Sequence, residues 1–173
     1  MEAFKSTFRL GNKAAVHEKL VEVFSSRNDI SQRRAIIEEM FHLLFSKHRF
    51  EIPKHLIIRK QEEILRNLSR RPDYQAYKAQ GGFMDQVAAL AEKQLKEEIL
   101  IDQIGDVERI RVEHKDIAHF LNLLSNERLK EFAYFRSFLD SMEECPIPLH
   151  ESMVRHTVRR EKTLNYILHC LTR

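Results

Sequence analysis

Glycine, proline and tryptophan are scarce in this sequence, and the shortage limits the folds that it can adopt. Among 173 residues there are four glycines, four prolines and no tryptophan, while charged residues make up 32% of the chain. A β-sandwich needs many tight turns, and such turns depend on glycine and proline. Leucine, isoleucine, glutamate, lysine and arginine, which dominate the middle of the chain, favour helices instead. The composition therefore predicts a helical protein, and the length suits one domain.

Cysteines and long apolar runs are also nearly absent, which excludes two further classes of protein. Cys145 and Cys170 are too few for a disulfide framework and too far apart for a close metal-ligand pair. We expect both to be free thiols in a reducing cytosol. The N-terminal segment lacks the apolar core of a signal peptide, and no apolar run reaches membrane-spanning length. These absences predict a soluble, cytoplasmic protein with no membrane partner.

Motifs that would indicate catalysis or metal binding are missing as well. No pair among the nine histidines has the His-Glu-x-x-His spacing, and His114 and His119, five apart, share a helical face poorly. No serine lies in a nucleophile elbow, and no glycine-rich loop could hold phosphate. Cys145 follows two glutamates, whose charge should raise the thiol pKa, the opposite of what a nucleophile needs. We expect no catalytic site, no metal and no cofactor.

The charge balance is only weakly basic, with 29 Lys and Arg against 26 Asp and Glu, a net charge of +3 and a pI near 8.9. Proteins that bind nucleic acid through phosphate contacts usually carry a denser basic face. Arginine does cluster in "RRAII", "SRRPDY" and "VRRE", and a helix could enter a groove of nucleic acid. A helical nucleic-acid-binding protein therefore stays an alternative, although acidic residues are interleaved almost everywhere.

Apolar residues recur every three or four positions from Ala14 to about His48, which predicts helix. The polar stretch "SSRNDISQ" interrupts this stripe. Asp29, followed by Gln32 three residues later, could cap a second helix there. We therefore expect two helical segments in this range, with one uninterrupted helix as the alternative.

Proline and glycine indicate where the remaining helices end. Pro53 suits the first turn of a helix that should stop near Arg71-Pro72, and Gly81-Gly82 should break the chain before a long helix from Phe83. Gly105 is expected to cap that helix. A short extended link and further helices should follow at residues 114–127, 127–144 and 151–173, with Pro146 and Pro148 before the last. The predicted fold class is all-α, with six or seven helices.

The predicted helix at 127–144 is rich in aromatic residues. Phe132, Phe135 and Phe138 recur every three residues, so they would lie on one side of the helix, and Met142 follows one turn later. Such a stripe is typical of a buried core. Alternatively, aromatic and methionine side chains that stay partly exposed can bind many apolar partners by repacking.

Five segments follow one another in a recognisable order: "FEIPKHLIIRKQEEIL", "AQGGF", "AEKQLKEEILIDQIG", "IRVEHKDIAHFLNLL" and "MVRHTVRREKTLNYIL". Their order resembles the C-terminal domain of trigger factor, the bacterial ribosome-associated chaperone. In that family an apolar residue and a proline lead into a charged helix, a glycine break, a long helix, a charged link and two further helices. The resemblance covers about residues 33–173 and lies in the order of the segments.

The resemblance implies an extended helical body with arm-like projections that enclose a cradle. Residues 1–48 would form the linker and first helical segment, residues 53–145 the arm region, and residues 151–173 a C-terminal helix. Nascent or unfolded polypeptides would be held there without ATP, through dispersed apolar and polar contacts. The family's roles would include protein folding, protein export and cell division.

Two parts of the family are not recognisable in this chain. The family docks on the ribosome through a Gly-Phe-Arg-x-Gly-x-x-Pro loop in a separate N-terminal domain. The stretch "TFRLGNKA" has Thr7 and Ala14 in place of the first glycine and the proline, so we interpret the overlap as chance. The family's prolyl isomerase is a separate β-rich domain, which these residues could not build. We expect the chain to be part of a longer protein whose peptidyl-prolyl isomerase activity lies elsewhere.

The residues that we expect to contact clients are exposed aromatic and methionine side chains on the helices: Phe83, Met84, Phe132, Phe135, Phe138, Met142 and Met153. The expected partners are nascent or unfolded polypeptides and, through the missing N-terminal domain, the ribosome; a homodimer is left open. A helical adaptor or scaffold that binds one protein partner is the alternative from another class. A relative of the periplasmic parvulin-type chaperones, which share the helical body, is a further alternative.

Overall fold

Six α-helices and one 3₁₀ helix make up the part of the protein that the structure describes. The computed structural model describes residues 13–126, 129–135 and 151–171, and these ranges contain no β-strand. The helices are α2 (Lys13–Lys47), α3 (Lys54–Leu68), α4 (Tyr74–Lys78), α5 (Phe83–Val107), α6 (His114–Ser125), η1 (Lys130–Phe132) and α7 (Glu151–Leu171). None of these helices is both long enough and apolar enough to cross a bilayer. The all-α prediction is confirmed.

Helix α2 runs without a break from Lys13 to Lys47, so the prediction of two segments is wrong. The stretch "SSRNDISQ" contains neither glycine nor proline, and nothing in it interrupts the backbone hydrogen bonds of the helix. Asp29 is exposed, where a weak helix former costs only about 0.7 kcal/mol relative to alanine. Ile30 is buried and continues the apolar stripe.

Proline and glycine mark the boundaries of helices at the positions that the sequence predicts. Pro53 is the N-cap of α3, directly before the first helical residue, and α3 ends at Leu68, shortly before Pro72. Gly82 has a φ of 76° immediately before α5, a left-handed conformation that glycine adopts without strain. Both breaks are therefore explained by the local sequence.

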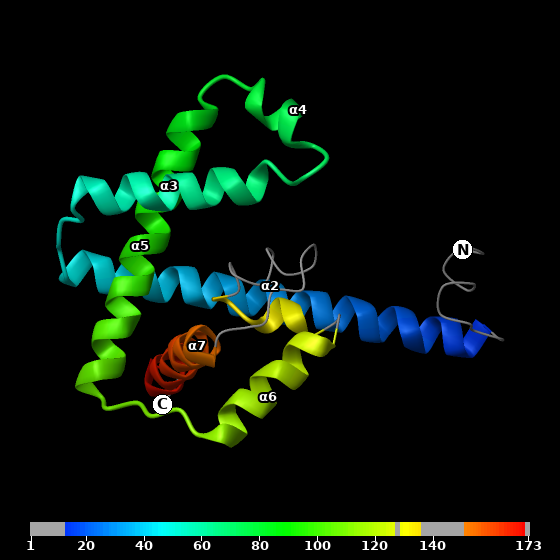
Figure 1. The fold of residues 1–173 in the computed structure, drawn as a ribbon. Coiled ribbons are helices and arrows are strands. Elements are labelled where there is room, and N and C mark those ends of the chain that lie inside the picture. The colour runs from blue at the N-terminus through cyan, green and yellow to red at the C-terminus, as the bar shows by residue number, and fades with distance from the viewer. Residues whose placement is uncertain (1–12, 127–128, 136–150, 172–173) are drawn as a thin grey trace.

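The main core lies where α2, α5 and α7 meet (Figure 1). It consists of seven buried side chains, Ile37, Met40 and Phe41 from α2, Leu100 and Ile101 from α5, and Leu164 and Ile167 from α7. The residues from α2 and α7 are spaced by three or four positions, as the buried stripe of an amphipathic helix requires. The apolar periodicity of the sequence thus marks the faces that these helices bury.

Two smaller apolar clusters flank the main core. The cluster between α3 and α5 consists of Ile64, Val87 and Ala91. The cluster between α6 and α7 consists of Phe120, Val154, Val158 and, from outside the helices, Ala133. In Figure 1, α3 and α4 stand on one side of α2 and α6 on the other, and α5 extends across both sides. Helix α5 therefore connects the two halves of the molecule.

A network of four charged side chains joins α3, α5 and α7. Lys60 on α3 is buried, and its Nζ lies 2.9 Å from Oε1 of Glu98 on α5. Arg160 on α7 binds the same carboxylate, with Nη1 3.0 Å from Glu98 Oε2. The Nε and Nη2 of Arg160 also donate to the two oxygens of Asp102, at 2.9 and 2.6 Å, a bidentate contact. The network fixes both α3 and α7 to α5.

Gly105 lies inside α5 and does not cap it, so that prediction is wrong. The helix continues to Val107, and Arg109, which is not a glycine, takes a left-handed φ of 54° beyond its end. Gly105 is buried against α7, and a Cβ at this position would lie 2.9 Å from Oγ1 of Thr163. The missing side chain therefore permits a close approach of two helices and has no role in ending one.

The link between α5 and α6 is not helical, as predicted, and side chains of α7 hold it in place. Three successive carbonyl oxygens accept hydrogen bonds of 3.0–3.1 Å, Ile110 from Arg159, Arg111 from Lys162 and Val112 from Arg155. The three donors share one face of α7, because their positions follow an i, i+4, i+7 spacing. The position of α6 after this link therefore depends on α7.

The prediction of a helix over residues 127–144 is wrong where the structure describes that range. Lys130–Phe132 form a single 3₁₀ turn, and Ala133 is then extended, with φ −71° and ψ 126°. Ala133 is buried against α6 and α7, a tertiary contact that the local pattern of apolar residues does not contain. The rest of the predicted helix lies outside the described residues, as do Phe138, Met142, Cys145, Pro146 and Pro148.

We predict that Gly105→Ala destabilises the protein, although alanine is the better helix former. The added Cβ would crowd Thr163 Oγ1, which is fully buried and donates to the Arg159 carbonyl at 2.8 Å, so it is not free to move aside. Crowding of this kind costs about 1–3 kcal/mol, against about 1 kcal/mol gained in helix propensity. We expect urea denaturation to show a net loss of about 1 kcal/mol in the free energy of unfolding.

Two controls separate crowding from a backbone effect. Gly81→Ala, at a glycine with open space around it, should change the free energy of unfolding by less than about 0.5 kcal/mol. Thr163→Ala removes the crowding oxygen, so Gly105→Ala should become neutral or stabilising in that background. An equal loss in both backgrounds would contradict the explanation.

Candidate functional site

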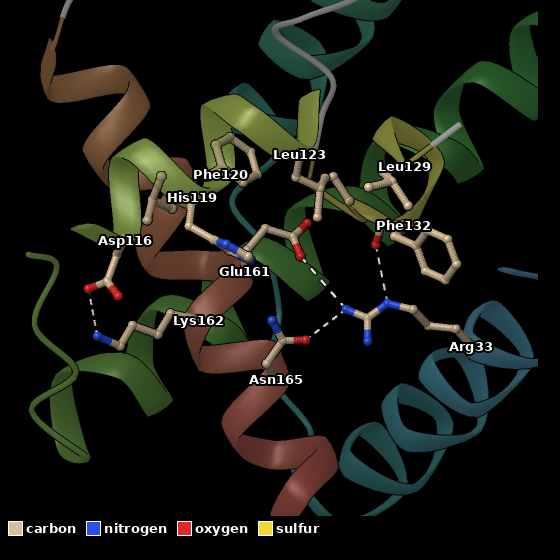
Figure 2. Close-up of a pocket in the computed structure, with 12 residues that line it drawn as sticks. Arg33, Asp116, His119, Phe120, Leu123, Leu129, Phe132, Glu161, Lys162 and Asn165 are labelled. Atoms are coloured by element: carbon tan, nitrogen blue, oxygen red, sulfur yellow. Dashed lines mark hydrogen bonds and ion pairs between the residues drawn. The ribbon is translucent and has the colours of Figure 1, made fainter. Parts of the chain in front are cut away.

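An open groove of about 480 Å³ lies between α2, α6, α7 and the 3₁₀ turn (Figure 2). Its apolar lining consists of Phe120, Leu123, Leu129, Phe132, Ala133 and Val158. Its polar lining consists of Arg33, Asp116, His119, Glu161, Lys162 and Asn165. The volume falls within the range of about 300–1,000 Å³ that is usual for ligand pockets.

Helical periodicity explains why both α6 and α7 contribute to the groove. The lining residues occupy positions 116, 119, 120 and 123 on α6, and positions 158, 161, 162 and 165 on α7. Both sets follow the i, i+3, i+4, i+7 spacing that puts side chains on one face of a helix. Each helix therefore presents a face of mixed polar and apolar character to the groove.

An ion pair between α6 and α7 closes one side of the groove. Lys162 Nζ lies 2.7 Å from Asp116 Oδ2 (Figure 2). Asp116 also accepts the backbone N–H of Glu113 at 2.9 Å, which caps the start of α6. The hydrogen bond from Lys162, followed by the one from Glu113, lowers the pKa of Asp116. The carboxylate therefore stays charged and the pair intact at neutral pH.

Residues 130–135, which we call the strap, border the other side of the groove through Phe132 and Ala133. Arg33 Nε donates to the carbonyl of Phe132 at 3.2 Å, and Arg33 Nη2 donates to Asn165 Oδ1 at 2.7 Å. Glu161 Oε1 accepts the backbone N–H of Phe135 at 2.5 Å, and Glu161 Oε2 lies 3.9 Å from Arg33. Figure 2 shows Arg33 reaching from α2 towards Phe132, Asn165 and Glu161. Two charged side chains thus bind the backbone of the strap.

A second group of polar side chains holds the strap against α5 and α2. The Tyr134 hydroxyl donates to Glu97 Oε2 at 3.1 Å and lies 3.4 Å from Glu38 Oε1. Lys93 Nζ binds Glu38 Oε2 at 2.6 Å and lies 3.8 Å from Glu97 Oε1. That buried Glu97 oxygen accepts no hydrogen bond from the described residues. Glu97 is therefore only partly compensated for its removal from water.

Burial sets the protonation of the groups that hold the strap. It raises the pKa of Glu97 to about 7, with Lys93 and Tyr134 acting in the opposite direction and Glu38 and Glu98 adding to the rise. Burial also raises the pKa of Glu161, although the Phe135 N–H and Arg33 act against it. Burial and the charge of Glu97 raise the pKa of the Tyr134 hydroxyl, which therefore remains a donor.

The structure does not gather the described client-binding candidates at one place. Phe132 lines the groove, whereas Phe135 packs against the main core and lines a separate cavity of about 130 Å³. Phe83 and Met84 are the first residues of α5, where Phe83 packs against the cluster shared with α3 and Met84 is 54% exposed. Met153, on α7, is 53% exposed. The three-residue repeat fails for Phe132 and Phe135 because the backbone leaves the helical path at Ala133.

Arg33 and Glu161 are the functional candidates that the sequence analysis missed. Each interrupts an apolar stripe: Arg33 lies between Ile30 and Ile37 on α2, and Glu161 lies three residues from both Val158 and Leu164 on α7. A charge on a face that is otherwise buried must find a partner there. The charged residue within an apolar stripe is visible in the sequence. Its partner, a backbone group of the strap far along the chain, is not.

The charged side chains that line the groove contact other groups of the protein. Across the described ranges, no three His, Cys, Asp or Glu side chains come together as metal ligands would. Arg33 and Glu161 bind backbone groups, and Lys162 binds Asp116. Beside these contacts lie apolar side chains that a second molecule could cover.

Two comparisons with known proteins find the same family. The family profile described as "Bacterial trigger factor protein (TF) C-terminus" matches residues 13–169. The trigger factor of Geobacter sulfurreducens is 23% identical over 159 residues, which cover 88% of this chain and 36% of that protein. The chain thus spans little more than a third of the length of that curated relative. No solved structure matches the chain.

We predict that ionisation of Glu97 costs stability as the pH rises from 4.5 to about 7. The folded protein holds the Glu97 proton more tightly than the unfolded chain, because the pKa is higher in the folded state. The stabilisation is therefore complete below pH 4.5 and lost above about pH 7. By linkage it is on the order of 3 kcal/mol. Urea denaturation at pH values across this window measures it.

Glu97→Gln isolates this contribution from the other titrating groups. The amide has the shape of the protonated acid and cannot ionise, so the variant should be more stable than the wild type above pH 7. The difference should shrink as the pH falls towards 4.5. Glu62→Gln, at an exposed position on α3, should leave the pH dependence unchanged. A Glu97→Gln curve parallel to that of the wild type would show that Glu97 does not titrate in this window.

Proposed function

Because this chain belongs to the family of bacterial trigger factor C-terminal domains, we propose that it is a chaperone domain that holds nascent or unfolded polypeptides without ATP. The observation that carries the proposal is the open groove, which is lined by both apolar and charged side chains. An unfolded polypeptide exposes apolar side chains and backbone polar groups together. A surface that offers partners for both can hold such a chain without selecting one sequence.

The groove alone would hold an unfolded segment weakly. Burying one leucine or phenylalanine side chain contributes about 1.5–3 kcal/mol, and a total of about 4 kcal/mol corresponds to a Kd near 1 mM. Met84 and Met153, each more than half exposed, offer further weak contacts on α5 and α7. Several weak contacts on one client act together through avidity while each is released quickly. Capture would therefore be effective and brief.

We keep the predicted client contacts as part of this proposal, namely Phe83, Met84, Phe132, Phe135, Phe138, Met142 and Met153. Helices α3 and α4, with the first turns of α5, project away from the main core (Figure 1), which supports an arm within residues 53–145. Residues 1–48 would then be the linker and first helical segment, and residues 151–173 the C-terminal helix.

For the whole protein we propose the further properties that the resemblance implies. These are docking on the ribosome and peptidyl-prolyl isomerase activity in domains outside this chain, a cytoplasmic location, and roles in protein export and cell division. They rest on the family match and on the relative, of which this chain covers 36%.

The arginines give little support to the nucleic-acid alternative. In the clusters "RRAII" and "VRRE", Arg33, Arg159 and Arg160 lie in ion pairs with carboxylates of the protein itself. A guanidinium group that is paired in this way is poorly placed to neutralise phosphates.

The proposal predicts that the chain suppresses aggregation of a chemically denatured, unrelated protein on dilution, without nucleotide. Leu123→Ser/Leu129→Ser, which makes the groove lining polar, should weaken suppression several-fold because apolar burial supplies the binding energy. Light scattering at increasing ratios of chain to client measures both effects.

The matched control is Val107→Ser, which changes a 78% exposed apolar residue at the end of α5, outside the groove lining. It should suppress aggregation as well as the wild type. Circular dichroism must show that all variants remain helical. A folded wild-type chain that gives no suppression would overturn the proposal and favour a helical adaptor with one protein partner.

A further inference from the structure

The strap occupies a site that recognises backbone atoms. Arg33 donates to the carbonyl of Phe132, and Glu161 accepts the N–H of Phe135, three residues later. In a β-turn a carbonyl and an N–H with this spacing would bond to each other. Here the Arg33 guanidinium takes the place of the donor and a carboxyl oxygen of Glu161 takes the place of the acceptor. Neither contact depends on the side chain of the residue that is bound.

The positions of Arg33 and Glu161 are set by the helical body. Arg33 lies one turn before Ile37 on α2, and Glu161 lies one turn before Leu164 on α7. Ile37 and Leu164 are both fully buried in the main core, so the two helix faces are fixed relative to each other. Arg33 Nη2 also donates to Asn165 Oδ1 at 2.7 Å, which fixes the orientation of the guanidinium. The two charged groups are therefore preorganised for a backbone ligand.

The side chains of residues 133–135 each lie in a different environment. Ala133 is buried with Phe120 and Val158 and lines the groove. The Tyr134 hydroxyl donates to Glu97. The Phe135 ring lies 5.9 Å from the guanidinium carbon of Arg160, within the range of a cation–π contact. The strap thus presents a small residue followed by two aromatic residues to this site.

We propose that Arg33 and Glu161 form a backbone-binding site for a client segment with a small residue followed by two aromatic ones, and that the strap is an internal occupant of this site. The inference rests on the proposed function, because it names the class of client segment that the domain holds. The open groove beside Phe132 and Leu129 gives such a segment a place from which to displace the strap.

Internal occupancy reduces the apparent affinity for outside segments. A tethered occupant competes at an effective concentration on the order of millimolar. The apparent Kd of an outside peptide is the intrinsic Kd divided by the fraction of molecules whose site is vacant. Weakening the strap should therefore tighten the binding of an outside peptide.

The experiment uses a labelled peptide that copies the strap, Lys-Glu-Phe-Ala-Tyr-Phe, blocked at both ends, with binding to the full chain measured by fluorescence anisotropy. Tyr134→Ser/Phe135→Ser removes the anchors of the internal occupant and leaves Arg33 and Glu161 in place. This variant should bind the peptide at least about tenfold more tightly than the wild type. Glu131→Ser, at an exposed strap position whose ion pair with Arg34 is long, at 3.9 Å, and open to solvent, should bind as the wild type does.

A second peptide tests the backbone contact without any change to the protein. N-methylation of its last phenylalanine removes the N–H that Glu161 would accept, and should weaken binding by about tenfold or more. Equal binding of the two peptides would overturn the inference, and so would a strap variant that is folded yet binds no more tightly than the wild type.

If the strap variant is not folded, hydrogen exchange in the wild-type chain decides the question. Saturating unlabelled peptide should increase exchange at the Phe135 amide, and unchanged protection would overturn the inference.

Failure of this inference is distinguishable from failure of the proposed function. Aggregation suppression without peptide binding leaves the chaperone proposal standing, whereas peptide binding without suppression supports the site and removes its role with clients.

Discussion

The contact of Arg160 with Glu98 and Asp102 is the interaction on which the rest of the structure depends. It fixes α7 to α5, and because Glu98 also binds Lys60, it ties α3 to the same place. All four groups are at least partly shielded from water, so loss of one would leave its partners with uncompensated charge. The long helix α5 can therefore project towards α3 and α4 while its other half stays in the core.

The charged side chains of α7 form hydrogen bonds with backbone groups that lie outside the helices and therefore lack a partner within regular secondary structure. Arg155, Arg159 and Lys162 satisfy carbonyls of the link before α6, and Glu161 satisfies an N–H of the strap. A buried backbone group without a partner costs free energy comparable to a lost hydrogen bond. The high charge content of this chain thus has a structural role inside the molecule as well as on its surface.

Much of the fold could be predicted from the sequence, because local signals determine it. The breaks at Pro53 and Gly82 and the helices that begin after them follow from backbone preferences and apolar periodicity. The errors at Gly105 and in the strap have one cause: contacts with α7, distant in sequence, decide both. For the same reason the sequence offered Phe132 only as a client-contact candidate, and its partner Arg33 could not be joined to it.

The dependence on α7 also bears on the order in which the chain is made. Synthesis proceeds from the N-terminus at about 5–20 residues per second, so residues 13–135 emerge several seconds before α7 is complete. During that interval the main core lacks Leu164 and Ile167, and the link carbonyls and the strap lack their donors and acceptor. The main core can therefore be completed only after α7 has been synthesised. Until then the nascent chain exposes apolar helix faces of the kind that a chaperone binds.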